Sequence, residues 1–195
     1  MKYTVPKGQH AFKIGGILPA VPVVRRGIER VEWRVKFAPN CAYSLTGVDQ
    51  GDWNKGGGVS FDLLDNHQDA AMWGWRYNPL TGLIELAAYC HIGGKRPFLK
   101  GSTYSVSHPG VSSEVCLEVE LGMEAVVTLV IGRKEKRYDL FFAIAGGRTY
   151  QVGVPYTHNK TMVRLINGWF GGKDDETQKQ TPAPHRMDID IKRSF

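Results

Sequence analysis

Apolar and charged residues alternate without a break in Arg30-Val31-Glu32-Trp33-Arg34-Val35-Lys36-Phe37. Because successive side chains of a strand point to opposite faces, this pattern predicts a β-strand with one face on a core and one in water. Residues 114–121 and 187–192 repeat the pattern. In the last of these stretches, Met187, Ile189 and Ile191 should point into the core.

Shorter apolar runs between Gly- and Pro-containing turns predict further strands, and no stretch has a 3.6-residue period of helical length. The expected fold is therefore an all-β sandwich or jelly roll, concanavalin-like, with few or no helices. These further strands are expected at 59–64, 71–77, 83–92, 103–107, 125–131, 138–144, 149–152 and 163–170.

The length and composition are those of one ordinary globular domain. The chain has 195 residues, of which 42% are hydrophobic and 23% charged, so disorder, collagen and coiled coil are excluded. No run of 18 apolar residues occurs, so no transmembrane helix and no membrane partner is expected. We expect a single domain over 1–195, with 171–184 as an exposed loop before the last strand. The polar part, 173–180, should be expendable for folding.

Charge and metal-binding residue types point to no specific partner or cofactor. The formal net charge is +6, but the basic residues are scattered over turns, so nucleic acid is not expected as a partner. The three cysteines and six histidines have no metal-site spacing, and the cysteines should be reduced and inert. The acidic stretches 49–52 and 174–176 could hold a structural Ca²⁺, although solvated carboxylates are the default, so we predict no cofactor.

The first six residues lack the shape of a signal peptide, and the apolar stretch 14–24 is broken by glycines and prolines. Two alternatives stay open. Either the protein is cytoplasmic, or a leader has been removed and the protein is extracellular or part of a virion.

The predicted hairpin formed by 71–77 and 83–92 is the one segment that suggests a binding site. If Tyr77 faces Leu83, odd-numbered residues of both strands share one sheet face. That face would present aromatic rings together with a few polar groups, while Arg76 would lie at the rim of the opposite face. The ring-bearing face would then contain Trp73, Trp75, Tyr77, Glu85, Tyr89 and His91.

Flat aromatic rings with nearby polar side chains suit a sugar, whose pyranose ring has an apolar C–H face and a rim of hydroxyl groups. The alternative is that the same aromatic face packs against the second sheet and forms core, as aromatic stripes commonly do. A one-residue bulge would also exchange part of the two faces.

Several stretches together resemble a group of uncharacterised proteins encoded in gut Bacteroidetes, their phages and metagenomes. The resemblance runs from about residue 45 to the C-terminus. In that group the Phe-Gly-Gly and Ala-Pro-His pieces usually lie a few residues apart, whereas here 173–181 separates them like a loop insertion. The resemblance implies a jelly-roll or concanavalin-like sandwich and transfers no catalytic residue. The stretches that carry it are Asp52-Trp53-Asn54-Lys55, Gly58-Val59-Ser60-Phe61, Trp73-Gly74-Trp75-Arg76, Ile84-Glu85-Leu86-Ala87-Ala88-Tyr89-Cys90-His91, Gly94-Lys95-Arg96, Phe170-Gly171-Gly172 and Ala183-Pro184-His185-Arg186-Met187-Asp188-Ile189.

Three functions remain after these observations. The first is lectin-like, non-catalytic binding of a polysaccharide, with Trp73, Trp75, Tyr77 and Tyr89 stacking on sugars. In that case Glu85, His91 and Arg76 would make polar contacts. Salt should matter little, because the basic residues do not visibly converge on the hairpin.

The second function is a glycan-active enzyme of the polysaccharide-lyase type. Tyr89, His91 and Arg76 would then supply the proton transfer and the cation that abstraction next to a uronate carboxylate requires. The third function is a structural virion or assembly protein, which needs only a self-associating surface.

Overall fold

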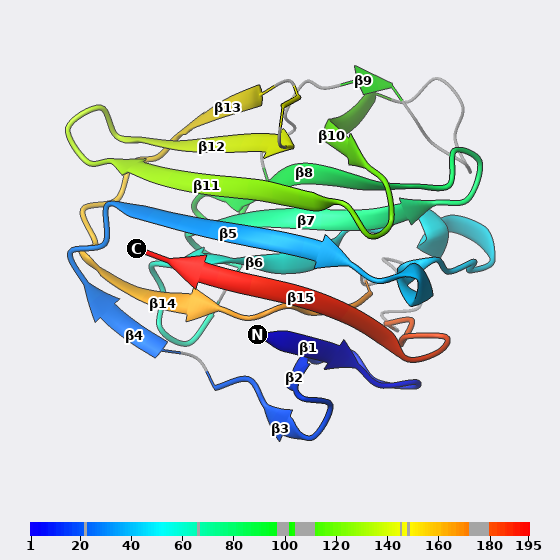
Figure 1. Cartoon of the computed structure of the whole chain (residues 1–195). Helices are drawn as coiled ribbons and strands as arrows, with labels where there is room; N and C mark the ends of the chain where they lie inside the picture. Colours follow the sequence, from blue (N-terminus) through cyan, green and yellow to red (C-terminus); the bar gives the residue numbers. More distant parts are fainter. Residues whose placement is uncertain are drawn as a thin grey trace.

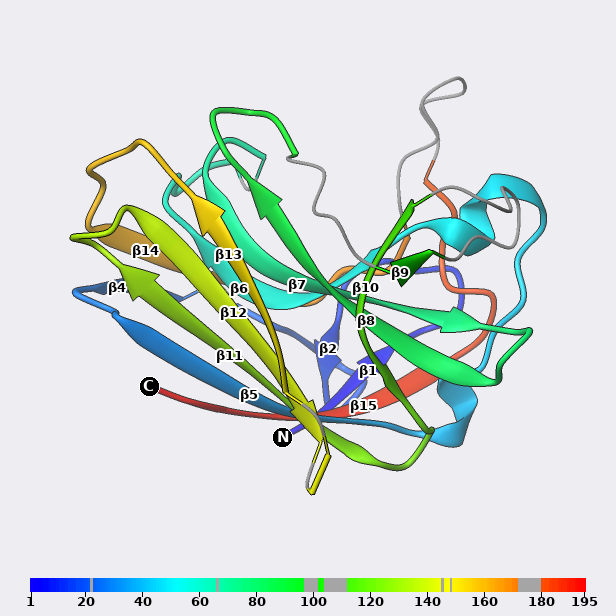
Figure 2. The same ribbon diagram turned by 90° about the horizontal axis from the view of Figure 1, so that it is seen from above.

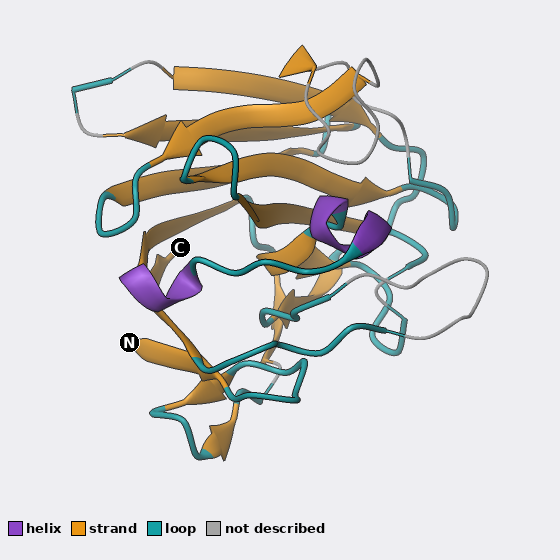
Figure 3. Cartoon of the chain, turned by 90° about the vertical axis from the view of Figure 1, so that its right-hand side faces the viewer, coloured by secondary structure: helices purple, strands orange, loops and turns teal. Residues whose placement is uncertain are grey.

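The computed structural model describes residues 1–21, 23–65, 67–96, 102–103, 112–144, 146–147, 149–171 and 180–195. Two antiparallel β-sheets pack face to face, as the two views of Figures 1 and 2 show. Within these residues there is no α-helix, and two short 3₁₀ turns, Pro39–Cys41 and Gly47–Gly51, lie at one side (Figure 3). The expected all-β sandwich is confirmed.

Eight strands form the first sheet, in the order β13-β12-β11-β5-β15-β1-β2-β3. Its centre contains the two strands with the clearest alternation, β5 and β15, which pair antiparallel with Ile189 opposite Phe37. The bounds are β1 Lys2–Val5, β2 Lys13–Ile14, β3 Leu18–Pro19, β5 Arg30–Phe37, β11 Glu124–Gly132, β12 Arg137–Ile144, β13 Thr149–Pro155 and β15 Met187–Ser194.

Seven strands form the second sheet, in the order β4-β14-β6-β7-β8-β10-β9. The predicted hairpin is its centre, as β7 and β8. The bounds are β4 Val23–Arg26, β6 Asn54–Ser60, β7 Ala70–Asn78, β8 Leu83–His91, β9 Ser102–Thr103, β10 Ser112–Val119 and β14 Met162–Ile166.

Alternation along β15 holds as predicted. Met187, Ile189 and Ile191 are buried, whereas Asp190 and Lys192 are exposed and Asp188 is half-buried. The first strand docks beside it, and the amino terminus of Met1 donates a hydrogen bond to the carbonyl of Ile191 at 3.0 Å. The last strand is therefore part of the sandwich, with its apolar residues in the core.

Several strand ends differ from the prediction. Strand β6 ends at Ser60 rather than Leu64, because the Asp62 carboxylate accepts hydrogen bonds from the amides of Leu64 and Asp65 and closes a bend. Strand β14 ends at Ile166 rather than Phe170. Of the strand expected at 103–107, residues 104–107 lie outside the described residues. No helix in the described part of the chain is long and apolar enough to cross a membrane.

The segment 171–184 is not an exposed loop throughout. Residues 172–179, which include most of the expendable stretch 173–180 and the acidic stretch 174–176, lie outside the described residues. The described ends are packed: Gly171 and Ala183 are buried, and the Thr181 hydroxyl donates to the Asp49 carboxylate at 2.6 Å. Backbone hydrogen bonds tie Ala183 to Gly8 and Gln9. The expectation of an exposed loop is therefore wrong for Gly171 and for 181–184.

Candidate functional site

The hairpin pairs one residue out of the predicted register. Tyr77 lies opposite Ile84, and Asn78 lies opposite Leu83. Sequence reasoning assigned Asn78 to the turn, but its buried side chain donates to the Glu85 carboxylate at 2.8 Å and accepts from the amide of Leu80. These bonds hold Asn78 in the strand and shorten the turn to four residues.

The shift of one residue separates the predicted site into two sets. Trp73 and Trp75 are fully buried between the sheets, where Trp75 contacts the rings of Phe37, Tyr43 and Phe170. Half-buried Tyr77 packs against the same core. The prediction that these three residues share a face with Glu85, Tyr89 and His91 is wrong, and the alternative that the rings form core is correct.

The opposite face of the seven-stranded sheet, which we call the outer face, contains Arg76, Glu85, Tyr89 and His91. Arg76 is not a rim residue. Its guanidinium is buried, donates to the Glu85 carboxylate at 2.6 Å and to the Gly51 carbonyl at 2.7 Å, and lies 4.3 Å from the centre of the Trp53 ring. A buried ion pair with several hydrogen bonds holds its members in place, so Arg76 and Glu85 fix the geometry of this face from within.

Two further cationic side chains, those of Lys55 and Arg96, lie against the ring of Tyr89. The Lys55 ammonium lies 5.5 Å from the centre of the Tyr89 ring, and the Arg96 guanidinium lies 4.2 Å from it. Burial lowers the pKa of Lys55, an effect that the charge of Asp52 opposes, and burial raises the pKa of Tyr89. Tyr89 is therefore a protonated phenol at neutral pH. Lys55 makes no ion pair with any described residue.

His91 is the unusual group of the outer face. The side chain is 7% exposed, and neither ring nitrogen has a hydrogen-bond partner among the described residues. Its neighbours are the rings of His67 at 5.0 Å and Tyr89 at 5.4 Å. Burial, with the charges of His67, Arg96 and Lys55, lowers the pKa of His91 to about 4. The imidazole is thus neutral at pH 7, with a donor and an acceptor available.

Trp169 belongs to the same face and was missed by sequence reasoning. It lies opposite Lys55, with which it exchanges two backbone hydrogen bonds of 2.8 Å. Directly opposed residues point to the same side, so the half-buried indole lies on the outer face. His10 stacks on it at 5.2 Å and 7°. The signal was available: Phe170 is core, and its neighbour in an extended chain must point away from the core.

Lys55, Trp53 and Arg96 were also missed. The cue for Trp53 is Gly74 of β7, where a side chain would touch the Trp53 ring. Gly56 of β6 lies against the Trp73 indole in the core, so the two glycines make room for large rings on opposite faces of the sheet. The order along the chain does not reveal which ring covers which glycine.

The described residues offer neither a metal-binding cluster nor a reactive thiol. No cluster of three His, Cys, Asp or Glu side chains within the described ranges could hold a metal ion. Burial raises the pKa of Cys41 and Cys90 to about 12 and that of Cys116 to about 11, so the thiols are protonated and inert.

Comparison with known proteins identifies the fold. No family model matches the chain, and no curated protein sequence matches it. Among solved structures, an alginate lyase superposes with a TM-score of 0.55 at 14% identity, covering 98% of this chain and 78% of that one. At that identity the likeness establishes a shared sandwich fold.

Two further structures superpose less closely. A protein from Saccharomyces cerevisiae described as functionally unknown has a TM-score of 0.47 at 10% identity, over 99% of this chain and 87% of its own. An alginate lyase from Klebsiella pneumoniae has a TM-score of 0.43 at 10% identity, over 85% of this chain and 59% of its own.

Proposed function

We propose that this protein binds an acidic polysaccharide, one that contains uronate sugars, on the outer face of the seven-stranded sheet. The contact residues are Lys55, Tyr89, His91 and Arg96, with the Arg76–Glu85 pair holding the sheet beneath them. This keeps the carbohydrate ligand expected from the sequence and moves it from the aromatic face, which is buried, to the face behind it.

The observation that carries the proposal is the buried His91 imidazole, which no described residue hydrogen-bonds, beside the half-buried Lys55 ammonium, which has no ion pair among the described residues. A buried polar group without a partner costs about 1–3 kcal/mol, so His91 calls for an occupant. A sugar hydroxyl can both accept from and donate to a neutral imidazole. A carboxylate pairs with an ammonium, and Tyr89 offers a flat ring beside both.

Charge favours an acidic sugar over a neutral one. The basic residues converge after all, because Lys55 and Arg96 both lie over Tyr89 and Arg76 lies on the adjoining Trp53 ring. For an acidic glycan these cations predict binding that weakens with salt, in contrast to the weak salt dependence expected from the sequence. The alginate lyase with this fold acts on a polysaccharide by its name, which is compatible with a glycan-related role here.

Calorimetric titration with an oligouronate tests the proposal. Lys55→Ala should weaken binding by about tenfold or more, because it removes a cation beside Tyr89 that has no ion-pair partner among the described residues. The matched control is Lys192→Ala, which removes the same charge from the exposed face of the other sheet. Equal losses in the two variants would contradict the proposal, because they would indicate attraction by overall charge alone.

A second function, lyase activity, is suggested by the proximity of His91 and Tyr89, whose ring centres lie 5.4 Å apart. A neutral imidazole can accept the proton from the carbon next to the uronate carboxylate. The released electron pair then forms a carbon–carbon double bond and expels the glycosidic oxygen, which takes a proton from the Tyr89 phenol. Lys55 and Arg96 would stabilise the charge that develops on the carboxylate.

Turnover distinguishes the two functions. An enzyme produces an unsaturated uronate, seen as growing ultraviolet absorbance. Tyr89→Phe, which removes the phenol and keeps the ring beside the sugar, should abolish that signal while oligouronate binding stays within a few-fold. Binding with no absorbance change under any condition would reject the lyase and leave the protein a binder.

A further inference from the structure

A cavity of about 260 Å³ opens at the edge of the seven-stranded sheet, next to Trp169. It lies where β14 passes the N-terminal segment, and the Asn167 amide donates to the Ala20 carbonyl across it at 2.7 Å. Its walls include Trp169, Ile166, Arg164, Asn167, Lys13 and Pro19.

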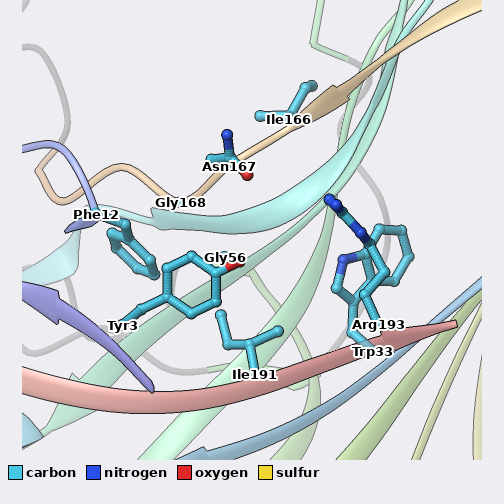
Figure 4. Close-up of a pocket in the computed structure, with 9 residues that line it drawn as sticks. All are labelled: Tyr3, Phe12, Trp33, Gly56, Ile166, Asn167, Gly168, Ile191 and Arg193. Carbon is cyan, nitrogen blue, oxygen red and sulfur yellow. The ribbon is translucent and has the colours of Figure 1, made fainter. Parts of the chain in front are cut away.

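Size distinguishes this cavity from its neighbour. On the other side of Gly168, a cavity of about 20 Å³ lies between the sheets, lined among others by Tyr3, Phe12 and Arg193 (Figure 4). That volume holds about one water molecule. The larger cavity is just below the range of roughly 300–1,000 Å³ that takes drug-sized ligands, and so suits a single ring.

The lining has the chemistry of a sugar site rather than of a packing defect. The Trp169 indole is held in place by its two backbone hydrogen bonds to Lys55 and by His10, whose Nδ1 contacts the Phe170 carbonyl at 2.9 Å. Among the described residues, nothing donates to the side-chain oxygen of Asn167 and nothing pairs with the Lys13 ammonium. A rigid ring, an acceptor and a cation therefore meet at one cavity.

The cavity adjoins the outer face of the seven-stranded sheet. Trp169 lies directly opposite Lys55, whose ammonium reaches Tyr89. Tyr89, Lys55 and Trp169 come from β8, β6 and the extension of β14, so they form a path across the strands. With about 4.8 Å between neighbouring strands, the three steps from β8 to β14 span about 14 Å, more than one sugar ring can cover.

We propose that this cavity is a second sugar subsite, which holds a further ring of the same acidic glycan against Trp169. The inference rests on the proposed function and adds that the protein prefers long oligosaccharides to short ones. Lys13 makes an acidic ring the preferred occupant of the cavity.

The test compares a hexauronate with a diuronate in titrations of five proteins, namely wild type, Trp169→Ala, Ala20→Leu, Tyr150→Ala and Lys55→Ala. Wild type should bind the hexauronate more tightly, and Trp169→Ala should lose about five- to tenfold in hexauronate affinity, the size of one aromatic contact, with the diuronate affinity unchanged. Tyr150→Ala, which removes an exposed ring from the other sheet, is the control and should change neither. Ala20→Leu narrows the cavity without touching Trp169 and should reproduce the selective loss.

The outcomes separate the two claims. If Trp169→Ala and Ala20→Leu both bind the hexauronate like wild type while Lys55→Ala weakens both ligands, the subsite is rejected and the proposed function stands. If wild type binds neither oligouronate, the proposed function fails and the subsite with it. If Trp169→Ala does not fold, the hexauronate affinity of Ala20→Leu alone tests the subsite.

Discussion

Trp75 and Lys55 lie on neighbouring strands and on opposite faces of one sheet, so their substitutions should have opposite consequences. Trp75 is fully buried among the rings of Phe37, Tyr43 and Phe170, whereas half-buried Lys55 extends over Tyr89. The role of a residue in this sheet therefore depends more on which face it occupies than on its type.

Trp75→Ala should lower the free energy of unfolding by about 3–5 kcal/mol, because it opens a large cavity in the core. Thermal denaturation followed by circular dichroism measures the loss. Lys55→Ala provides the comparison and should melt close to wild type. A Trp75→Ala protein that melts like wild type would show that the ring is not core.

His91 should make stability depend on pH. Its pKa is about 4 in the folded protein and near its ordinary value of 6.5 in the unfolded chain. Between these values the unfolded state therefore binds more protons than the folded state. The contribution of His91 to the free energy of unfolding is thus full above pH 6.5 and is lost as the pH falls toward 4. Melting temperatures measured from neutral pH downward should fall more steeply for wild type than for His91→Phe. Parallel profiles would contradict this.

Among the elements, two of the three strands with strict alternation were predictable, whereas the third strand and the hairpin register were not. In the third, β10, a register shift between Val115 and Leu117 breaks the alternation, and the strand ends at Val119 rather than Leu121. Strand β5 matches its expected range at both ends, and β15 keeps every predicted face, because alternation of side chains is a local property. The register of β7 against β8 depends on Asn78, whose side chain binds Glu85 across the strands. A contact of that kind cannot be predicted from the sequence. Without it, the predicted register placed Trp73, Trp75 and Tyr77 in the binding site, although they belong to the core.

The docked C-terminal strand gives a sharp stability test. Ile189→Asp should cost several kcal/mol because it buries a charge without a partner, whereas Asp190→Asn changes an exposed side chain and should cost nearly nothing. Urea denaturation of the two variants measures the difference. Equal midpoints would mean that the strand is not docked as described.

At the scale of the whole molecule, the two outer faces differ in how deeply their polar side chains are buried. On the eight-stranded sheet, Arg34, Lys36 and Lys192 are exposed, as expected of an ordinary solvated face. On the seven-stranded sheet, Lys55 is half-buried and His91 is buried. This asymmetry could not be predicted from the net charge of +6, because composition does not say which polar side chains are covered.

Salt should distinguish the kind of glycan that is bound. Affinity for an oligouronate should fall as ionic strength rises, because Lys55 and Arg96 contact a charged ligand and are screened. A neutral glucan of the same length should bind weakly at every salt concentration. Tight, salt-independent binding of the neutral glucan would instead favour stacking without charge.

The most direct measurement is an NMR titration of the isotope-labelled protein with an oligouronate, following backbone amides and indole N–H groups. We predict that the shifts gather at Lys55, Tyr89, His91 and Trp169, on the outer face of the seven-stranded sheet, while Lys36 and Lys192 on the other sheet stay unchanged. Shifts confined to the eight-stranded sheet, or no shifts at any ligand concentration, would contradict it.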